Sequence, residues 1–102
     1  RLDELFHALS DRTRRRMLRR LSEGPAIVRE LAEPFSMSIP AVAKHLRVLE
    51  RAKLVARTVD GRVHRCELSP KALKTADAWL EQYRAFWDGT LDALAEYAEK
   101  AK

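Results

Sequence analysis

Asp60 and Gly61 stand between two segments, residues 54–59 and 62–68, in which apolar and polar side chains alternate. An Asp-Gly pair in this setting is a strong signal for a β-hairpin, because both residues tolerate the positive φ angles of a tight two-residue turn. Elsewhere the apolar residues recur three and four positions apart, which is the periodicity of amphipathic helices. The sequence therefore predicts a mainly helical domain that carries one small antiparallel hairpin.

The remaining segments predict five helices, which with the hairpin give the order α-α-α-α-β-β-α. The length of 102 residues is that of one domain. Ser10 or Asp11 can cap the second helix, and Gly24 ends it. Residues 34–37 are too few and too interrupted for an element of their own, so we expect a tight turn there. The other four helices are predicted at residues 2–9, 27–33, 38–53 and 70–100.

Basic residues concentrate in the first two thirds of the chain. The whole chain carries 20 Lys and Arg against 15 Asp and Glu, a formal net charge of +5. Residues 1–69 hold 15 of the basic and 9 of the acidic side chains, whereas residues 70–102 hold 5 and 6. This distribution indicates that the first part of the chain meets a polyanion and that the last helix has another role.

The segments from residue 26 to residue 68 have the order of a winged helix-turn-helix. Residues 26–53 supply a helix, a tight turn and a second helix, and residues 54–68 supply the hairpin that forms the wing. In such domains the first helix braces the DNA backbone, while the second lies in the major groove, whose width admits an α-helix. We therefore expect residues 1–102 to form one winged helix domain that binds double-stranded DNA.

The helix at residues 38–53 has an apolar stripe of Val42, Leu46 and Leu49, and the opposite face suits DNA. Small residues near its N-terminus permit close approach to base edges, and cations further along the helix reach phosphates. Cations near the tip of the wing enter the minor groove or contact phosphates. The residues predicted to contact DNA are Ser38, Ile39, Pro40, Ala43, Lys44, His45, Arg47, Arg51, Arg62, His64 and Arg65.

Each of these assignments has an alternative. A solvated cationic helix face and a charged edge hairpin would have the same composition. His45 lies beside the contact face, so a structural role is the alternative to a phosphate contact. The arginines between residues 12 and 20 form the densest basic cluster. Their spacing is equally compatible with contact to the DNA backbone, solvation and pairing with acidic side chains, so we leave them out of the predicted site.

Four stretches of the chain resemble the ArsR family of bacterial regulators. Residues 9–18, LSDRTRRRML, are similar to the opening helix of that family, and residues 28–32, VRELA, to its bracing helix. Residues 38–49, SIPAVAKHLRVL, are similar to its recognition helix, and residues 52–55, AKLV, lead into the wing. The resemblance covers nearly the whole chain. It implies a dimeric winged-helix repressor whose first and last helices form the dimer interface.

Three positions depart from the pattern of the resembled family. That family usually has Gln at the position of Ile39 and Ser at the position of Ala43, and both commonly face DNA. The apolar replacements remove hydrogen-bonding groups, and contact with thymine methyl groups is the available substitute. The family's usual Gly before the wing is Lys53 here, a change that we expect to be neutral.

Apolar residues on the first and last helices favour a homodimer independently of this resemblance. Aromatic side chains lie three to four positions apart on the last helix, which favours packing against another helix over a small-molecule pocket. A monomer would expose them together with the apolar residues of the first helix, a larger patch than monomers usually carry. The residues predicted at the dimer interface are Leu2, Leu5, Phe6, Trp79, Tyr83, Phe86, Trp87, Leu91 and Leu94.

We expect no metal or other cofactor. Many members of the resembled family release DNA when a metal binds to cysteines on the bracing helix or to Asp and His on the last helix. Here residues 28–33 contain no cysteine and residues 70–102 contain no histidine. The carboxylates of the last helix, such as Asp77, fit a solvated face better than a metal site. Cys66 fits an apolar filler better than a redox switch, although Arg65 beside it would activate a thiolate. A small-molecule effector stays open.

The sequence thus predicts a cytoplasmic, homodimeric transcriptional regulator, in the simplest case a repressor that binds a pseudo-palindromic operator. A winged-helix module that binds proteins and not DNA is the alternative. The apolar residues Ile39, Pro40 and Ala43 suggest this alternative, whereas the basic charge argues against it. No nucleophile–base pair, glycine-rich phosphate loop or metal triad indicates an enzyme. The single cysteine suits a reducing compartment, and no apolar run approaches the ~20 residues of a membrane span.

Overall fold

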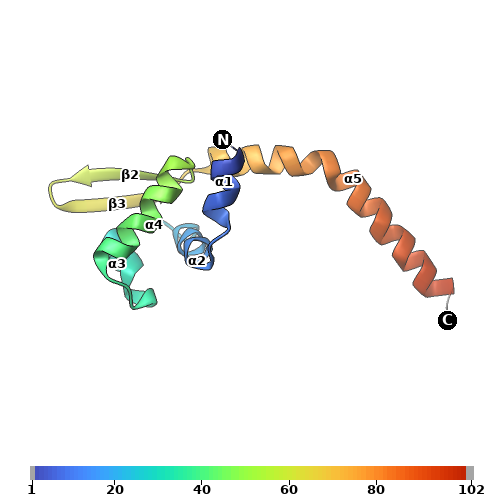
Figure 1. The fold of residues 1–102 in the computed structure, drawn as a ribbon, viewed down its shortest axis with the longest axis horizontal. Helices are drawn as coiled ribbons and strands as arrows, with labels where there is room; N and C mark the ends of the chain where they lie inside the picture. Colours follow the sequence, from blue (N-terminus) through green and yellow to red (C-terminus); the bar gives the residue numbers. More distant parts are fainter. Residues whose placement is uncertain (1, 101–102) are drawn as a thin grey trace.

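The structure is a computed structural model. It describes residues 2–100, except for the side chain of Trp87. It is mainly helical, with a small antiparallel sheet, as the sequence predicts (Figure 1). The elements are α1 (Leu2–Leu9), α2 (Arg12–Leu21), β1 (Ala26–Ile27), α3 (Val28–Ala32), the 3₁₀ helix η1 (Glu33–Phe35), α4 (Ile39–Arg51), β2 (Val55–Asp60), β3 (Val63–Leu68) and α5 (Pro70–Lys100).

The sheet has three strands, whereas the sequence predicts only the two of the hairpin. Ala26 and Ile27, the latter predicted as the start of a helix, pair with β3 opposite Cys66 and Arg65. The strand order is therefore β1-β3-β2. Two residues are too few to show an alternating pattern, so β1 has no signal in the sequence. The segment predicted as a plain turn, residues 34–37, overlaps the 3₁₀ helix η1, which begins one residue earlier at Glu33.

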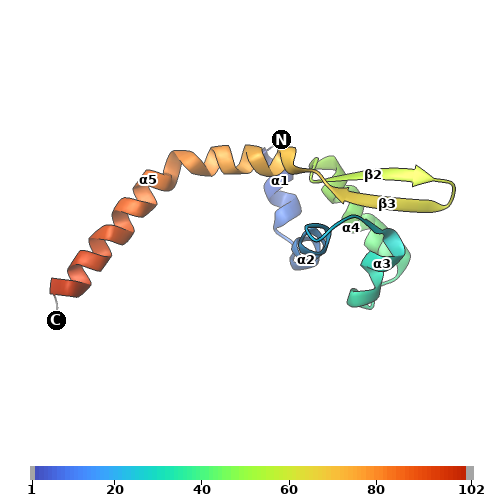
Figure 2. The same ribbon diagram turned by 180° about the vertical axis from the view of Figure 1, so that it is seen from behind.

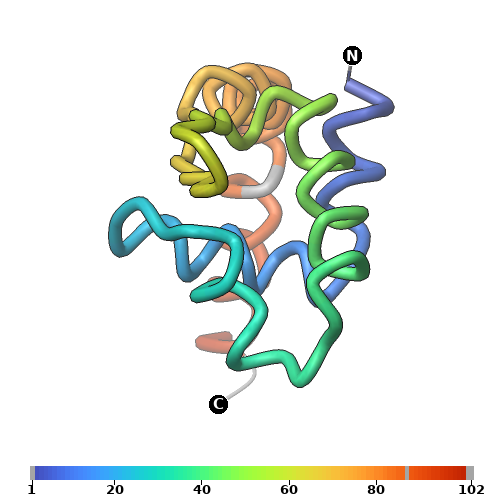
Figure 3. The backbone as a smooth tube through the Cα atoms, turned by 90° about the vertical axis from the view of Figure 1, so that its left-hand side faces the viewer, coloured from blue at the N-terminus to red at the C-terminus, as the bar shows by residue number. Residues whose placement is uncertain are grey.

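The core lies where α1, α2, α3, α4 and the base of the sheet meet. The predicted stripe of α4, Val42, Leu46 and Leu49, is fully buried there. Figure 3 shows α1 running beside α4, with which it shares the core. Because one face of α4 is held inward by this packing, its opposite face is directed away from the domain. The largest fully buried side chains are Met17, Leu31, Leu46, Leu49, Leu54, Val42 and Cys66.

Leu5 corrects one part of the predicted dimer interface. Its side chain is only 2% exposed and belongs to the core of its own chain. The prediction that Leu5 meets a partner is therefore wrong. The apolar positions of α1 divide between two sides of the helix, since Leu5 and Ala8 face inward whereas Phe6 is partly exposed. Phe6 packs edge-on against Trp79 of α5, with ring centroids 5.5 Å apart.

Helix α5 leaves the rest of the domain after its first turns (Figures 1 and 2). Ala72 and Ala76 are buried against the body, whereas the later apolar side chains are exposed, Phe86 by 71% and Leu94 by 60%. The helix is 31 residues long, and the molecule extends over 64 × 27 × 21 Å. Among the helices within residues 2–100, none combines the length and apolar character needed to cross a bilayer.

Lys53 adopts the left-handed conformation that ends α4. Its φ is 63°, and its N–H donates to the carbonyl oxygen of Glu50, while the Leu54 N–H donates to that of Leu49. These bonds form a Schellman motif, in which the left-handed residue is usually glycine. A Cβ is unfavourable in this conformation, so we expect that Lys53 in place of glycine costs stability and is not a neutral replacement.

Lys53→Gly is expected to raise the free energy of unfolding by about 1 kcal/mol, because it removes the steric cost of a Cβ at positive φ. Urea denaturation measures this change, at one protein concentration for all variants. Lys53→Ala is the matched control, because it removes the same charge but retains the Cβ. Equal urea midpoints for the Gly and Ala variants would contradict the prediction.

Candidate nucleic-acid interface

The outward face of α4 is the centre of the candidate site. Ser38 caps the helix, with its Oγ accepting a hydrogen bond from the Ala41 N–H at 3.3 Å, and Pro40 occupies the first turn. This cap starts the helix directly at the predicted contact residues. The predicted contact residues of α4 and its cap that are exposed are Ser38, Ile39, Pro40, Lys44, Arg47 and Arg51, and Ala43 is partly exposed.

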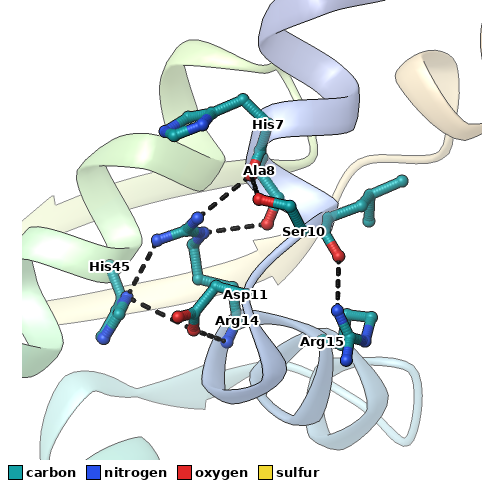
Figure 4. Close-up of polar contacts among 8 residues, drawn as sticks. His7, Ala8, Ser10, Asp11, Arg14, Arg15 and His45 are labelled. Atoms are coloured by element: carbon teal, nitrogen blue, oxygen red, sulfur yellow. Dashed lines mark hydrogen bonds and ion pairs between the residues drawn. The ribbon is translucent and has the colours of Figure 1, made fainter.

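His45 is directed toward α2 and not along the outward face (Figure 4). Its Nδ1 lies 3.2 Å from Nη1 of Arg14 and 3.9 Å from Oδ2 of Asp11. Because a guanidinium only donates hydrogen bonds, Nδ1 of His45 is the acceptor in its contact with Arg14. Of the two roles that the sequence leaves open for His45, this geometry supports the structural one.

The buried Arg14 joins α1, α2 and α4 in one hydrogen-bond network (Figure 4). Its side chain is 8% exposed, and besides His45 it donates to the carbonyl oxygens of Ala8, at 2.8 Å, and His7, at 3.0 Å. These carbonyls lie at the end of α1, where the helical N–H groups run out, and the His7 carbonyl also accepts from the N–H and the hydroxyl of Ser10. The guanidinium therefore completes the C-terminus of α1 and at the same time holds the side of the recognition helix.

Asp11 caps α2 within the same network. Its carboxylate accepts a hydrogen bond from the backbone N–H of Arg14 at 3.0 Å, and this bond lowers the pKa of Asp11 below its ordinary value. Asp11 was one of two predicted caps, and the structure selects it. The network as a whole was not predicted from the arginine cluster. Its only sequence signal is the spacing of Arg14, Met17 and Leu21, which places Arg14 on the apolar face of α2.

The wing supplies a second group of cations. Arg62 and Arg65 are exposed, and His64 is partly exposed. Arg57 donates to Oε1 of Glu50 and lies 3.3 Å from Nδ1 of His64. Arg57 therefore ties the wing to α4. The wing residues predicted to meet DNA are Arg62, His64 and Arg65, of which His64 lies beside Arg57.

A hollow of about 350 Å³ lies between the N-terminal half of α4 and the wing. The sequence predicts α4 and the wing as separate contact surfaces, but the structure joins them in one concave surface. Sequence reasoning missed Arg29 and Val63, because only the packing of the wing against the helices brings them beside Ile39. The lining residues are apolar (Ile27, Val28, Ile39, Ala43, Val63) and basic (Arg29, Arg57, Arg62, His64).

Neither a redox switch nor a metal centre has support in the geometry. Cys66 is fully buried, and burial raises the pKa of its thiol, the opposite of what a reactive thiolate needs. Cys66 thus has the packing of the apolar filler that the sequence favours. Within residues 2–100, no three His, Cys, Asp or Glu side chains lie close enough together to hold a metal ion.

Comparisons with known proteins give one consistent class. A family described as a helix-turn-helix domain matches residues 9–58. The chain is 37% identical to the HTH-type transcriptional regulator Rv2034 of Mycobacterium tuberculosis, over 92% of this chain and 85% of that protein. It is 29% identical to the transcriptional repressor SdpR of Bacillus subtilis, over 78% of this chain and 88% of that protein. The crystal structure of the ArsR family transcriptional regulator RHA00566 superposes on this chain with a TM-score of 0.80 and 40% sequence identity. The match covers 85% of this chain and 96% of that chain.

Proposed function

Because the chain belongs to the ArsR family of helix-turn-helix transcriptional regulators, we propose that it is a homodimeric repressor that binds a pseudo-palindromic operator in double-stranded DNA. In this proposal α4 enters the major groove and the wing contacts the neighbouring backbone. The protein acts in the cytoplasm, and its role is regulatory and not catalytic. The comparisons favour this class over a winged-helix module that binds only proteins.

The observation that carries the proposal is the polarity of α4. Val42, Leu46 and Leu49 are buried, while Lys44 and Arg47 are exposed on the other side of the same helix. Lys44 and Arg47 are three positions apart, so they share one helix face. A helix held in this way presents cations to a groove without exposing its apolar stripe.

The dimer is supported by the exposed apolar side chains of α5. Trp79, Tyr83, Phe86, Leu91 and Leu94 are all exposed, and the rings of Trp79 and Tyr83 are in tilted contact, with centroids 5.1 Å apart. A monomer rarely leaves so many large apolar groups in water. The predicted role of Trp87 lies outside the described side chains. To read two half-sites of an operator, the two recognition helices of this dimer must lie about 34 Å apart, one helical turn of DNA.

Phe86→Glu combined with Leu94→Glu is expected to convert the dimer into a monomer, because it places two charges in an apolar interface. Sedimentation equilibrium should give twice the chain mass of 11.7 kDa for the wild type and 11.7 kDa for this variant. Ala85→Glu combined with Ala95→Glu is the matched control, because it adds the same charges among exposed acidic residues of α5. A wild type that sediments as a monomer, or a dimeric Phe86/Leu94 variant, would refute the interface.

DNA binding itself is tested by selection from a pool of random duplexes. The proposal expects an enriched pseudo-palindromic sequence whose affinity falls steeply with salt, because cations of the protein displace counterions from phosphates. A wild-type protein that enriches no duplex would refute the proposed function.

A further inference from the structure

The first turns of α4 carry apolar side chains where a recognition helix approaches the bases. Ile39 is 49% exposed, and Ala43 lies one turn further along the same face. Val63 of the wing, 50% exposed, lines the same hollow. None of these three side chains can donate or accept a hydrogen bond. Readout by these three side chains therefore depends on apolar contact.

The charges around the hollow indicate the kind of partner. Arg29 and Arg62 lie at its lining, and Lys44 and Arg47 are exposed on the adjoining face of α4. An apolar surface bordered by cations is complementary to a polyanion that also presents apolar groups. Duplex DNA is such a partner, because the C5-methyl group of thymine projects into the major groove between two rows of phosphates.

The C5-methyl group is not unique to thymine. 5-Methylcytosine carries a methyl group on the same ring carbon, whereas uracil and cytosine carry hydrogen there. Apolar side chains respond to the methyl group itself, because they make no hydrogen bond to the neighbouring exocyclic group.

On the basis of the proposed function, we propose that Ile39, Ala43 and Val63 form a reader of pyrimidine C5-methyl groups. In each half-site one thymine places its methyl group against Ile39 at the edge of the hollow. At that position 5-methylcytosine binds better than cytosine, so cytosine methylation in the operator strengthens binding.

Single thymine-to-uracil replacements in the selected duplex test this reader. Burial of one methyl group contributes enough to predict an affinity about fourfold lower for uracil at one position of each half-site. At the same position, methylating a cytosine should raise the affinity about fourfold. Fluorescence anisotropy with labelled duplexes measures both ratios.

Ile39→Ala is expected to bring two affinity ratios close to one, that of thymine to uracil and that of 5-methylcytosine to cytosine. The substitution removes the side chain that contacts the methyl group. The half-exposed position of Ile39 makes a loss of folding a minor effect, and circular dichroism checks it. Val59→Ala is the matched control, because Val59 is an exposed apolar residue of β2 that does not line the hollow. This control should retain the wild-type ratios.

The outcomes separate this inference from the proposed function. If an enriched duplex binds equally well with thymine and uracil at every position, the methyl reader is refuted and the regulator is not. If Ile39→Ala keeps the wild-type ratios, another residue reads the methyl group and the assignment to this hollow fails. If no duplex is enriched, the proposed function fails first.

Discussion

Replacing Lys44 and Arg47 together by alanine is expected to weaken operator binding by about 2–3 kcal/mol, or about 30- to 150-fold. Both side chains are exposed on the face of α4 opposite its buried stripe. Each cation that meets a phosphate releases about one counterion, so the slope of log K against log salt should become shallower by about two for each protomer. Anisotropy titrations between about 50 and 200 mM salt measure the affinity and the slope.

Lys74→Ala combined with Lys100→Ala is the control for this experiment. It removes the same number of positive charges, but from exposed positions on α5. If the loss of affinity came only from net charge, both double variants would bind equally weakly. The docking of α4 in DNA requires a large loss for the Lys44/Arg47 variant alone. Unchanged DNA binding by the Lys44/Arg47 variant would refute the assignment of α4 to the DNA interface.

Replacing Arg14 by alanine is expected to lower the free energy of unfolding by about 2–3 kcal/mol, because it removes a buried cation that donates to one buried and two part-buried acceptors. The acceptors are the carbonyl oxygens of His7 and Ala8 and Nδ1 of His45. The lost volume adds a cavity at the junction of α1, α2 and α4. Urea denaturation at a fixed protein concentration measures the effect, because dimerisation makes stability depend on concentration.

Arg15→Ala is the matched control for Arg14→Ala. Arg15 is exposed, and its guanidinium donates to the carbonyl oxygen of Leu9 at 2.8 Å, so it makes a similar bond in a solvated setting. We expect Arg15→Ala to cost less than about 1 kcal/mol, because water replaces the lost donor. Similar urea midpoints for the two variants would show that the buried network does not stabilise the domain.

Much of the candidate site follows from local patterns. The Asp60-Gly61 pair predicts the hairpin, and the buried stripe of α4 predicts which of its side chains face outward. The short strand β1 and the inward position of Leu5 were not predicted, since a two-residue segment has no periodicity and α1 carries apolar residues on two sides. His45 lies close enough to the outward face that sequence spacing alone does not separate its two roles.

The sequence by itself determined the order of the five α-helices and the two strands of the wing, the outward face of the recognition helix and its cationic character. The apolar and polar residues that indicate these properties alternate with the period of a helix or a strand. Residues close together in the sequence are therefore enough to define them. Only the tertiary structure decided that Arg14 is the buried member of a run of arginines, and that Val63 joins Ile39 in one hollow. Both depend on groups brought together from distant segments, and packing of the whole domain sets those contacts.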